Sequence, residues 1–147
     1  MSLGDKLIAA SENLPGRFIE QKDGTFLLEA KIAERKVLVQ KKTLMYKAHL
    51  RVDDQKKVVR FFEILKETAF GMSSGGDAMD ISPGFGIKME TYKVAGKARE
   101  GSIKEQSKLF GKEYKYSFDW ANVRKTVEEK AREAGYSLSV VLNERSI

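Results

Sequence analysis

The chain has 147 residues, no cysteine and a formal net charge of +6. Its length suits one domain, and 41% hydrophobic residues are enough for a core of its own. The lack of cysteine excludes disulfides, thiol nucleophiles and cysteine-ligated metals, and a single histidine excludes metal binding by histidine pairs. No apolar run approaches the ~20 residues of a membrane span. We therefore expect a cytoplasmic protein with no membrane span, metal or cofactor.

The N-terminal part of the chain predicts a helix followed by a hairpin. Residues 3–13 favour a short helix that ends before Pro15. The pair Asp23-Gly24 predicts a tight turn, because glycine readily supplies the positive φ that such turns need. After this turn, residues 25–33 alternate with apolar side chains at the even positions, which is typical of a strand with one buried face.

The next run, residues 36–52, changes its apolar phase. Its apolar side chains are first odd-numbered and then even-numbered: Val37 and Val39, then Leu44, Ala48 and Leu50. Successive side chains of a strand point to opposite faces, so one flat strand cannot bury both sets. A bulge or turn near 40–43 is therefore expected.

An amphipathic helix is expected after Asp53 or Asp54, whose carboxylates can accept hydrogen bonds from first-turn amides. The stripe that predicts it has helical spacing and consists of Val58, Phe61, Phe62, Leu65 and Ala69. Residues 71–86 follow, rich in glycine and serine, and are expected to connect two halves of the domain. This segment is either a connection, most mobile over 72–83, or a lid or partner-contact loop.

The second half of the chain predicts strands and one further helix. Residues 86–95 favour a strand, whereas the polar stretch 97–108 fits either a hairpin arm or an exposed loop. Alternating aromatic residues predict a strand over 112–119, and Asp119 is placed to cap a helix. A final strand is expected over 136–142.

Together these elements predict a single α+β domain over residues 1–147. We expect a mostly antiparallel sheet of about six or seven strands with two helices packed on one face. A weak similarity between residues 44–53 and 110–119 suggests an internal strand–helix repeat.

The charge excess of the chain falls entirely in residues 31–51, which contain seven basic residues and one acid. If even positions of 44–50 are in the core, the opposite face carries Lys41, Lys47, His49 and Arg51. Such a row suits an anionic partner, because phosphate contacts give affinity without sequence preference. It is also typical of a solvated strand on which lysines discourage pairing with other chains.

The sequence contains no catalytic signature. Any imidazole chemistry would have to use His49, which is expected to face solvent, flanked by cations and without an acid nearby in sequence. We expect a non-catalytic protein that binds nucleic acid or another polyanion on the basic face. The alternative is a small-molecule-binding protein with an apolar pocket under residues 70–86. An enzyme limited to carboxylate, lysine or tyrosine chemistry is a third possibility.

Overall fold

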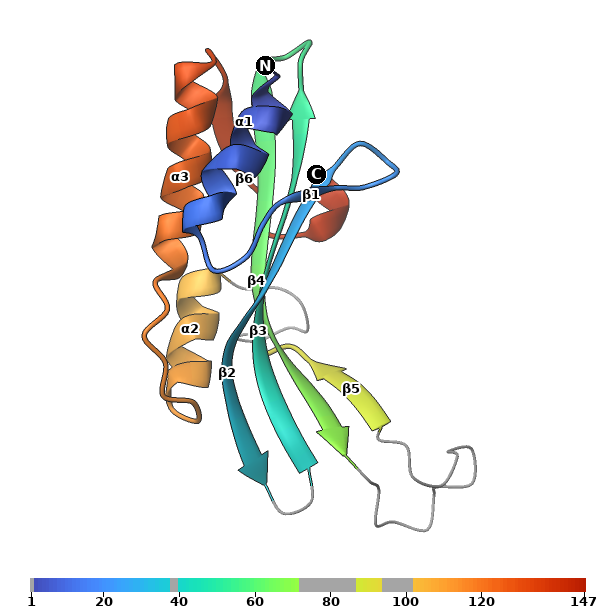
Figure 1. Cartoon of the computed structure of the whole chain (residues 1–147), viewed down its shortest axis with the longest axis vertical. Helices are drawn as coiled ribbons and strands as arrows, with labels where there is room; N and C mark the ends of the chain where they lie inside the picture. The colour runs from blue at the N-terminus through green and yellow to red at the C-terminus, as the bar shows by residue number, and fades with distance from the viewer. Residues whose placement is uncertain (1, 38–39, 72–86, 94–101) are drawn as a thin grey trace.

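A computed structural model describes residues 2–37, 40–71, 87–93 and 102–147, which form one α+β fold (Figure 1). The sheet has the order β1–β2–β3–β4–β5, and β6 pairs with β4. Its strands are β1 (Ile19–Glu20), β2 (Phe26–Val37), β3 (Gln40–Asp53), β4 (Val58–Gly71), β5 (Ile87–Thr91) and β6 (Ser137–Val140). The helices are α1 (Leu3–Ala10), α2 (Ile103–Gly111) and α3 (Trp120–Glu133), with 3₁₀ turns η1 (Ser11–Asn13) and η3 (Glu144–Ser146).

The predicted fold class is confirmed at this level. Every strand pair is antiparallel except β4–β6, which is parallel. The sheet has six strands, within the predicted range, but the described residues form three α-helices rather than two.

One face of the sheet, which we call the helix face, carries the hydrophobic core. It presents the even-numbered side chains of β3, and Leu44, Tyr46, Ala48 and Leu50 are fully buried there as expected. The apolar sides of the helices complete the same cluster, with Leu7 from α1, Phe110 from α2, and Val123, Val127 and Ala131 from α3. Burial of this contiguous apolar surface is the main stabilising contribution to the fold.

The helix predicted after Asp53 is wrong, because these residues form β4. Both faces of this strand are covered, and every residue from Phe61 to Ala69 is buried. A strand covered on both faces needs no polar alternation, so its apolar side chains can match a helical spacing by chance. Asp53 does accept hydrogen bonds from the amides of Gln55 and Lys56, but it does so in the β3–β4 turn. The proposed internal strand–helix repeat required a helix after Asp53, whereas the structure has strand β4 at this position.

Of the two alternatives near 40–43, the bulge is wrong, and the chain instead reverses direction between Val37 and Gln40. β3 is regular from Gln40 onward, and Val37 of β2 pairs with Gln40, so Val37 and the even-numbered apolar set belong to two different strands. The register shift lies instead in β2, between Lys31 and Ala33. Residue 39 and the side chain of Val37 lie outside the described part of the structure.

Two connections of the second half also differ from expectation. The strand predicted over 112–119 is wrong, because residues 114–119 form no strand. Tyr114 is buried in the core, and Tyr116 and Phe118 pack against it. The polar stretch around residue 105 is helix α2, whose N-cap Ser102 accepts a hydrogen bond from the amide of Glu105. The predicted Asp119 cap of α3 is confirmed, with Ala121 N donating to its carboxylate.

The Asp23-Gly24 turn between β1 and β2 is confirmed, and Gly24 has φ +83°, a conformation that favours glycine. Gly135 after α3 has the same φ. Residues 72–86, the predicted connection or lid, lie outside the described residues. Among those that are described, no helix is long and apolar enough to cross a membrane.

Figure 1 shows how these elements leave one part of the sheet projecting. The helices lie on one side, and the end of the β2–β3 hairpin extends below the lower end of α2, beside the paired ends of β4 and β5. The opposite face, which we call the second face, carries the odd-numbered side chains of β3. After β6 the chain continues to η3, which reaches this second face.

Candidate functional site

The projecting end of the β2–β3 hairpin is strongly basic. The register places Arg35 opposite Lys42 and Lys36 opposite Lys41. Directly opposite side chains in an antiparallel pair have Cβ atoms about 5 Å apart, and like charges in this position are destabilising. We call Arg35, Lys36, Lys41 and Lys42 the basic tip.

Acids compensate this charge only in part. On the second face, Lys41 lies 3.1 Å from a carboxylate oxygen of Glu34, which also pairs with Lys31. Hydrogen bonds from Lys31 and Lys41 hold the pKa of Glu34 below its usual value. Lys36 is exposed and forms no ion pair with any residue that the structure describes.

The other two cations of the basic tip face the helices. Lys42 lies 3.8 Å from a carboxylate oxygen of the buried Glu67, and the Arg35 guanidinium stands over the Tyr114 ring at 5.4 Å. The Tyr114 hydroxyl donates to Glu67 at 2.7 Å, and burial together with this bond raises the pKa of the phenol. These contacts tie Arg35 and Lys42 to the core, whereas Lys36 and Lys41 remain accessible.

The four predicted site residues lie on one face of β3, as alternation required, but their surroundings differ. Lys41 belongs to the basic tip and has a side chain that is 50% exposed. Lys47 and His49 are largely covered, with side chains 19% and 17% exposed, and both contact Glu144 of η3. Arg51 donates to the backbone carbonyl of Asp23 at 3.4 Å. The predicted continuous basic row is therefore interrupted by the C-terminal turn.

His49 lies in a chain of hydrogen bonds between the C-terminal turn and the residue that precedes β2. Its Nδ1 is 2.9 Å from the Glu144 carboxylate, and its Nε2 is 2.7 Å from the Thr25 hydroxyl. That hydroxyl donates its single proton to Asp23 at 2.6 Å, so it can only accept from His49. The carboxylate of Glu144 is also an acceptor. Both ring nitrogens of His49 are therefore placed beside hydrogen-bond acceptors.

This geometry also resembles the carboxylate–imidazole–hydroxyl order of a hydrolase, but it does not suit catalysis. Thr25 is fully buried, and its proton is already donated to Asp23. A nucleophile must reach the reacting carbon of a substrate, which a fully buried hydroxyl cannot do. The arrangement instead attaches the C-terminal turn to the sheet. The expectation that His49 faces solvent is wrong, because Glu144, 95 residues later in the chain, covers it.

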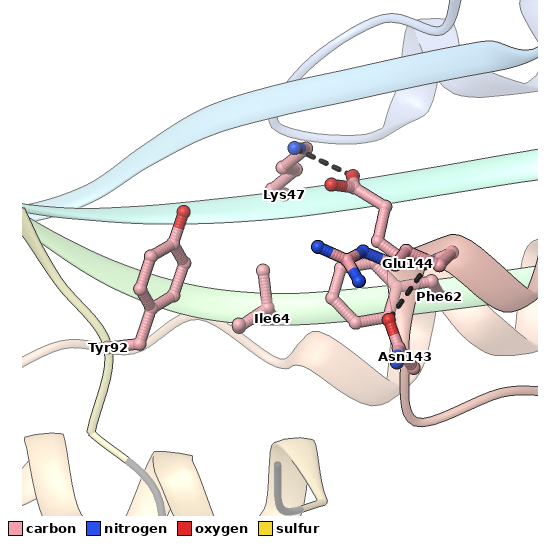
Figure 2. Close-up of a pocket in the computed structure, with 7 residues that line it drawn as sticks. Lys47, Phe62, Ile64, Tyr92, Asn143 and Glu144 are labelled. Atoms are coloured by element: carbon pink, nitrogen blue, oxygen red, sulfur yellow. Dashed lines mark hydrogen bonds and ion pairs between the residues drawn. The ribbon is translucent and has the colours of Figure 1, made fainter. Parts of the chain in front are cut away.

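A small cavity lies beside this attachment on the second face (Figure 2). Its volume is about 140 Å³, and its lining residues are Lys47, Phe62, Ile64, Tyr92, Asn143, Glu144 and Arg145. Sequence reasoning did not find it, since its walls come from three regions far apart in the chain.

Buried carboxylates on the helix face form a separate structural cluster. The Tyr46 hydroxyl donates to Glu63 at 2.6 Å, and Arg124 of α3 donates to the same carboxylate at 3.0 Å. Burial raises the pKa of Glu63, although the bonds from Tyr46 and Arg124 act in the opposite direction. Within the described ranges, no group of three or more histidine and acidic side chains is arranged to hold a metal ion.

No protein-family model, no curated protein and no solved structure matches this chain.

Proposed function

We propose that the chain binds nucleic acid through the phosphate backbone, with Lys36 and Lys41 of the basic tip as the main contacts. The observation that supports this most strongly is the pair of like-charged cross-strand positions at the end of a projecting hairpin. These positions reduce hairpin stability, and binding to a polyanion would compensate for that loss.

The position of the cations supports a phosphate contact. In the strand register, Lys41 pairs with Phe70 of β4, and Phe70 pairs with Lys88 of β5. A third basic residue therefore lies in the same cross-strand row as Lys36 and Lys41. An extended row of lysines can follow a backbone with regularly spaced phosphates.

The composition of the basic tip favours binding that is independent of base sequence. Sheets that recognise bases display exposed aromatic side chains for stacking. The only aromatic residue in 31–51 is Tyr46, which is fully buried. Contacts to phosphate would therefore dominate the affinity.

The test compares two double variants of equal charge. In Lys36→Gln/Lys41→Gln the two accessible cations of the basic tip are removed. In the matched control, Lys104→Gln/Lys125→Gln, two exposed lysines are removed from α2 and α3. Fluorescence anisotropy with labelled RNA and DNA at low salt measures both.

We expect the first double variant to weaken binding by about tenfold or more for every sequence tested, because phosphate contacts are lost. The control should bind like the wild type. Equal weakening in both variants would show that only the net charge matters. If Arg51→Gln loses affinity and the basic-tip variant does not, the nucleic acid contacts the other end of β3, near Arg51. Either result would overturn the proposal.

A further inference from the structure

The cavity on the second face has an apolar floor and a polar rim. Phe62 and Ile64 of β4 form the floor and are 6% and 3% exposed. In Figure 2, Ile64 lies between the Tyr92 ring and Asn143. The volume of about 140 Å³ is close to that of an apolar cavity of ~150 Å³ that binds benzene. The space therefore suits one six-membered ring.

The charges around the cavity favour an anion. Among the described residues, Glu144 is the only acid that lines it, and its carboxylate is 2.7 Å from Lys47 Nζ and 2.9 Å from His49 Nδ1. Lys47 thus neutralises this single negative charge, and His49 adds a hydrogen bond to the same carboxylate. Arg145 at the rim is exposed and forms no ion pair within the described part of the chain. A ligand carboxylate near Arg145 would supply the missing counter-charge.

The wall that carries Arg145 is fixed before any ligand binds. The amide of Arg145 donates to the Asn143 side chain at 3.0 Å, and the Glu144 side chain is held by Lys47 and His49. Just before the turn, Val141 N donates to the carbonyl of Phe61 on β4 at 2.8 Å. A wall fixed in this way loses little conformational entropy when a ligand binds.

We propose that this cavity binds a small aromatic carboxylate. The ring lies on Phe62 and Ile64, and the carboxylate faces Arg145. This site is distinct from the basic tip, and the inference does not depend on nucleic-acid binding.

The probe for the test is benzoate, compared with benzyl alcohol and benzylamine as neutral and cationic ligands of similar size. Titrations are followed by NMR on the Ile64 methyl groups and the backbone amides of 143–145. We expect saturable shifts at these positions with benzoate, with a Kd of about 1 mM. Benzyl alcohol should bind about tenfold more weakly, since it lacks the charge, and benzylamine more weakly still.

Two variants separate the charge from the cavity itself. Arg145→Gln should weaken benzoate about tenfold and leave benzyl alcohol unchanged, because Arg145 acts only on the carboxylate. Lys125→Gln on α3 removes an exposed charge elsewhere and should change neither ligand. The proposal is overturned if the shifts with benzoate do not saturate, if they spread over the whole chain, or if all three probes bind equally. Unchanged benzoate affinity in Arg145→Gln would overturn it as well.

Discussion

The Glu144 carboxylate of η3 accepts a hydrogen bond from Nδ1 of His49 on β3 at 2.9 Å, across 95 residues of sequence. The same carboxylate lies 2.7 Å from Lys47 Nζ. Through these two contacts the end of the chain covers the middle of the basic row. The end of the row at the basic tip remains open, with the Lys41 side chain 50% exposed.

The first prediction concerns this attachment. Glu144→Gln removes the negative charge that Lys47 and His49 share, and should lower the free energy of unfolding by about 1 kcal/mol at neutral pH, since the group is partly solvent-screened. Burial tends to raise the pKa of Glu144, but the hydrogen bonds from Lys47 and His49 outweigh it and lower the pKa below 4.5. The contribution is therefore fully present above pH 4.5 and is lost as the pH falls through the lower folded-state pKa.

Urea unfolding at several pH values measures this effect. The difference between wild type and Glu144→Gln should shrink as the solution becomes more acidic. Glu128→Gln is the control, because Glu128 pairs only with the exposed Arg132 of the same helix. A pH-independent difference, or an equal effect in the control, would contradict the role assigned to Glu144.

The second prediction concerns the buried Glu63. Arg124→Met leaves this carboxylate with only the Tyr46 hydroxyl, and should cost about 3 kcal/mol, because an unpaired buried charge is expensive. The pKa of Glu63 is already raised by burial. Because the pKa of Glu63 is higher in the folded state than in the unfolded state, its contribution to stability is fully present below pH 4.5 and is lost as the pH rises through the folded-state pKa. The penalty of Arg124→Met should therefore be smallest in acid.

Chemical denaturation from acidic to neutral pH checks this. Arg132→Met, on the exposed side of α3, should cost less than about 1 kcal/mol and serves as the matched control. The triple variant Arg124→Met/Glu63→Met/Tyr46→Phe removes the charge without leaving the buried Tyr46 hydroxyl unpaired, and should recover most of the loss at neutral pH. If the triple variant is no more stable than Arg124→Met, the loss comes from packing and not from the charge.

The third prediction follows from the like-charged pairs. Lys36→Glu places a negative charge directly opposite Lys41 on the neighbouring strand. This pair of opposite charges should stabilise the fold by about 0.5 kcal/mol. The same change should weaken nucleic-acid binding, since it removes one cation and adds an acid at the contact. Thermal unfolding and anisotropy on the same sample measure the two effects. Stabilisation without loss of binding would show that the pairs are unrelated to function.

The sequence predicted those elements whose signals are local. The Asp23-Gly24 turn, the Asp119 cap and the alternation of β3 depend on a few neighbouring residues, and each was found. The helix predicted at 54–69 failed because β4 is buried on both faces, and this burial depends on what packs against it. The helix α2 was missed because Gln106 interrupts its apolar stripe. Its side chain is buried and accepts from the amide of Leu65, which no local pattern shows.

The candidate site was predicted in part for the same reason. Alternation correctly placed Lys41, Lys47, His49 and Arg51 on one face of β3. It could not show that Glu144 pairs with two of them, since that contact joins residues 95 positions apart. It also could not show that Lys36 lies opposite Lys41, because this depends on where the β2–β3 hairpin turns.

The salt dependence of nucleic-acid binding tests the central claim most directly. The logarithm of the association constant should fall linearly with the logarithm of salt concentration, by about 0.7 to 0.9 per phosphate contacted. If Lys36 and Lys41 each bind a phosphate, Lys36→Gln/Lys41→Gln should flatten this slope by about 1.4 to 1.8, and Lys104→Gln/Lys125→Gln should leave it unchanged. An unchanged slope in the basic-tip variant, or no measurable affinity of the wild type for DNA or RNA at low salt, would contradict the claim.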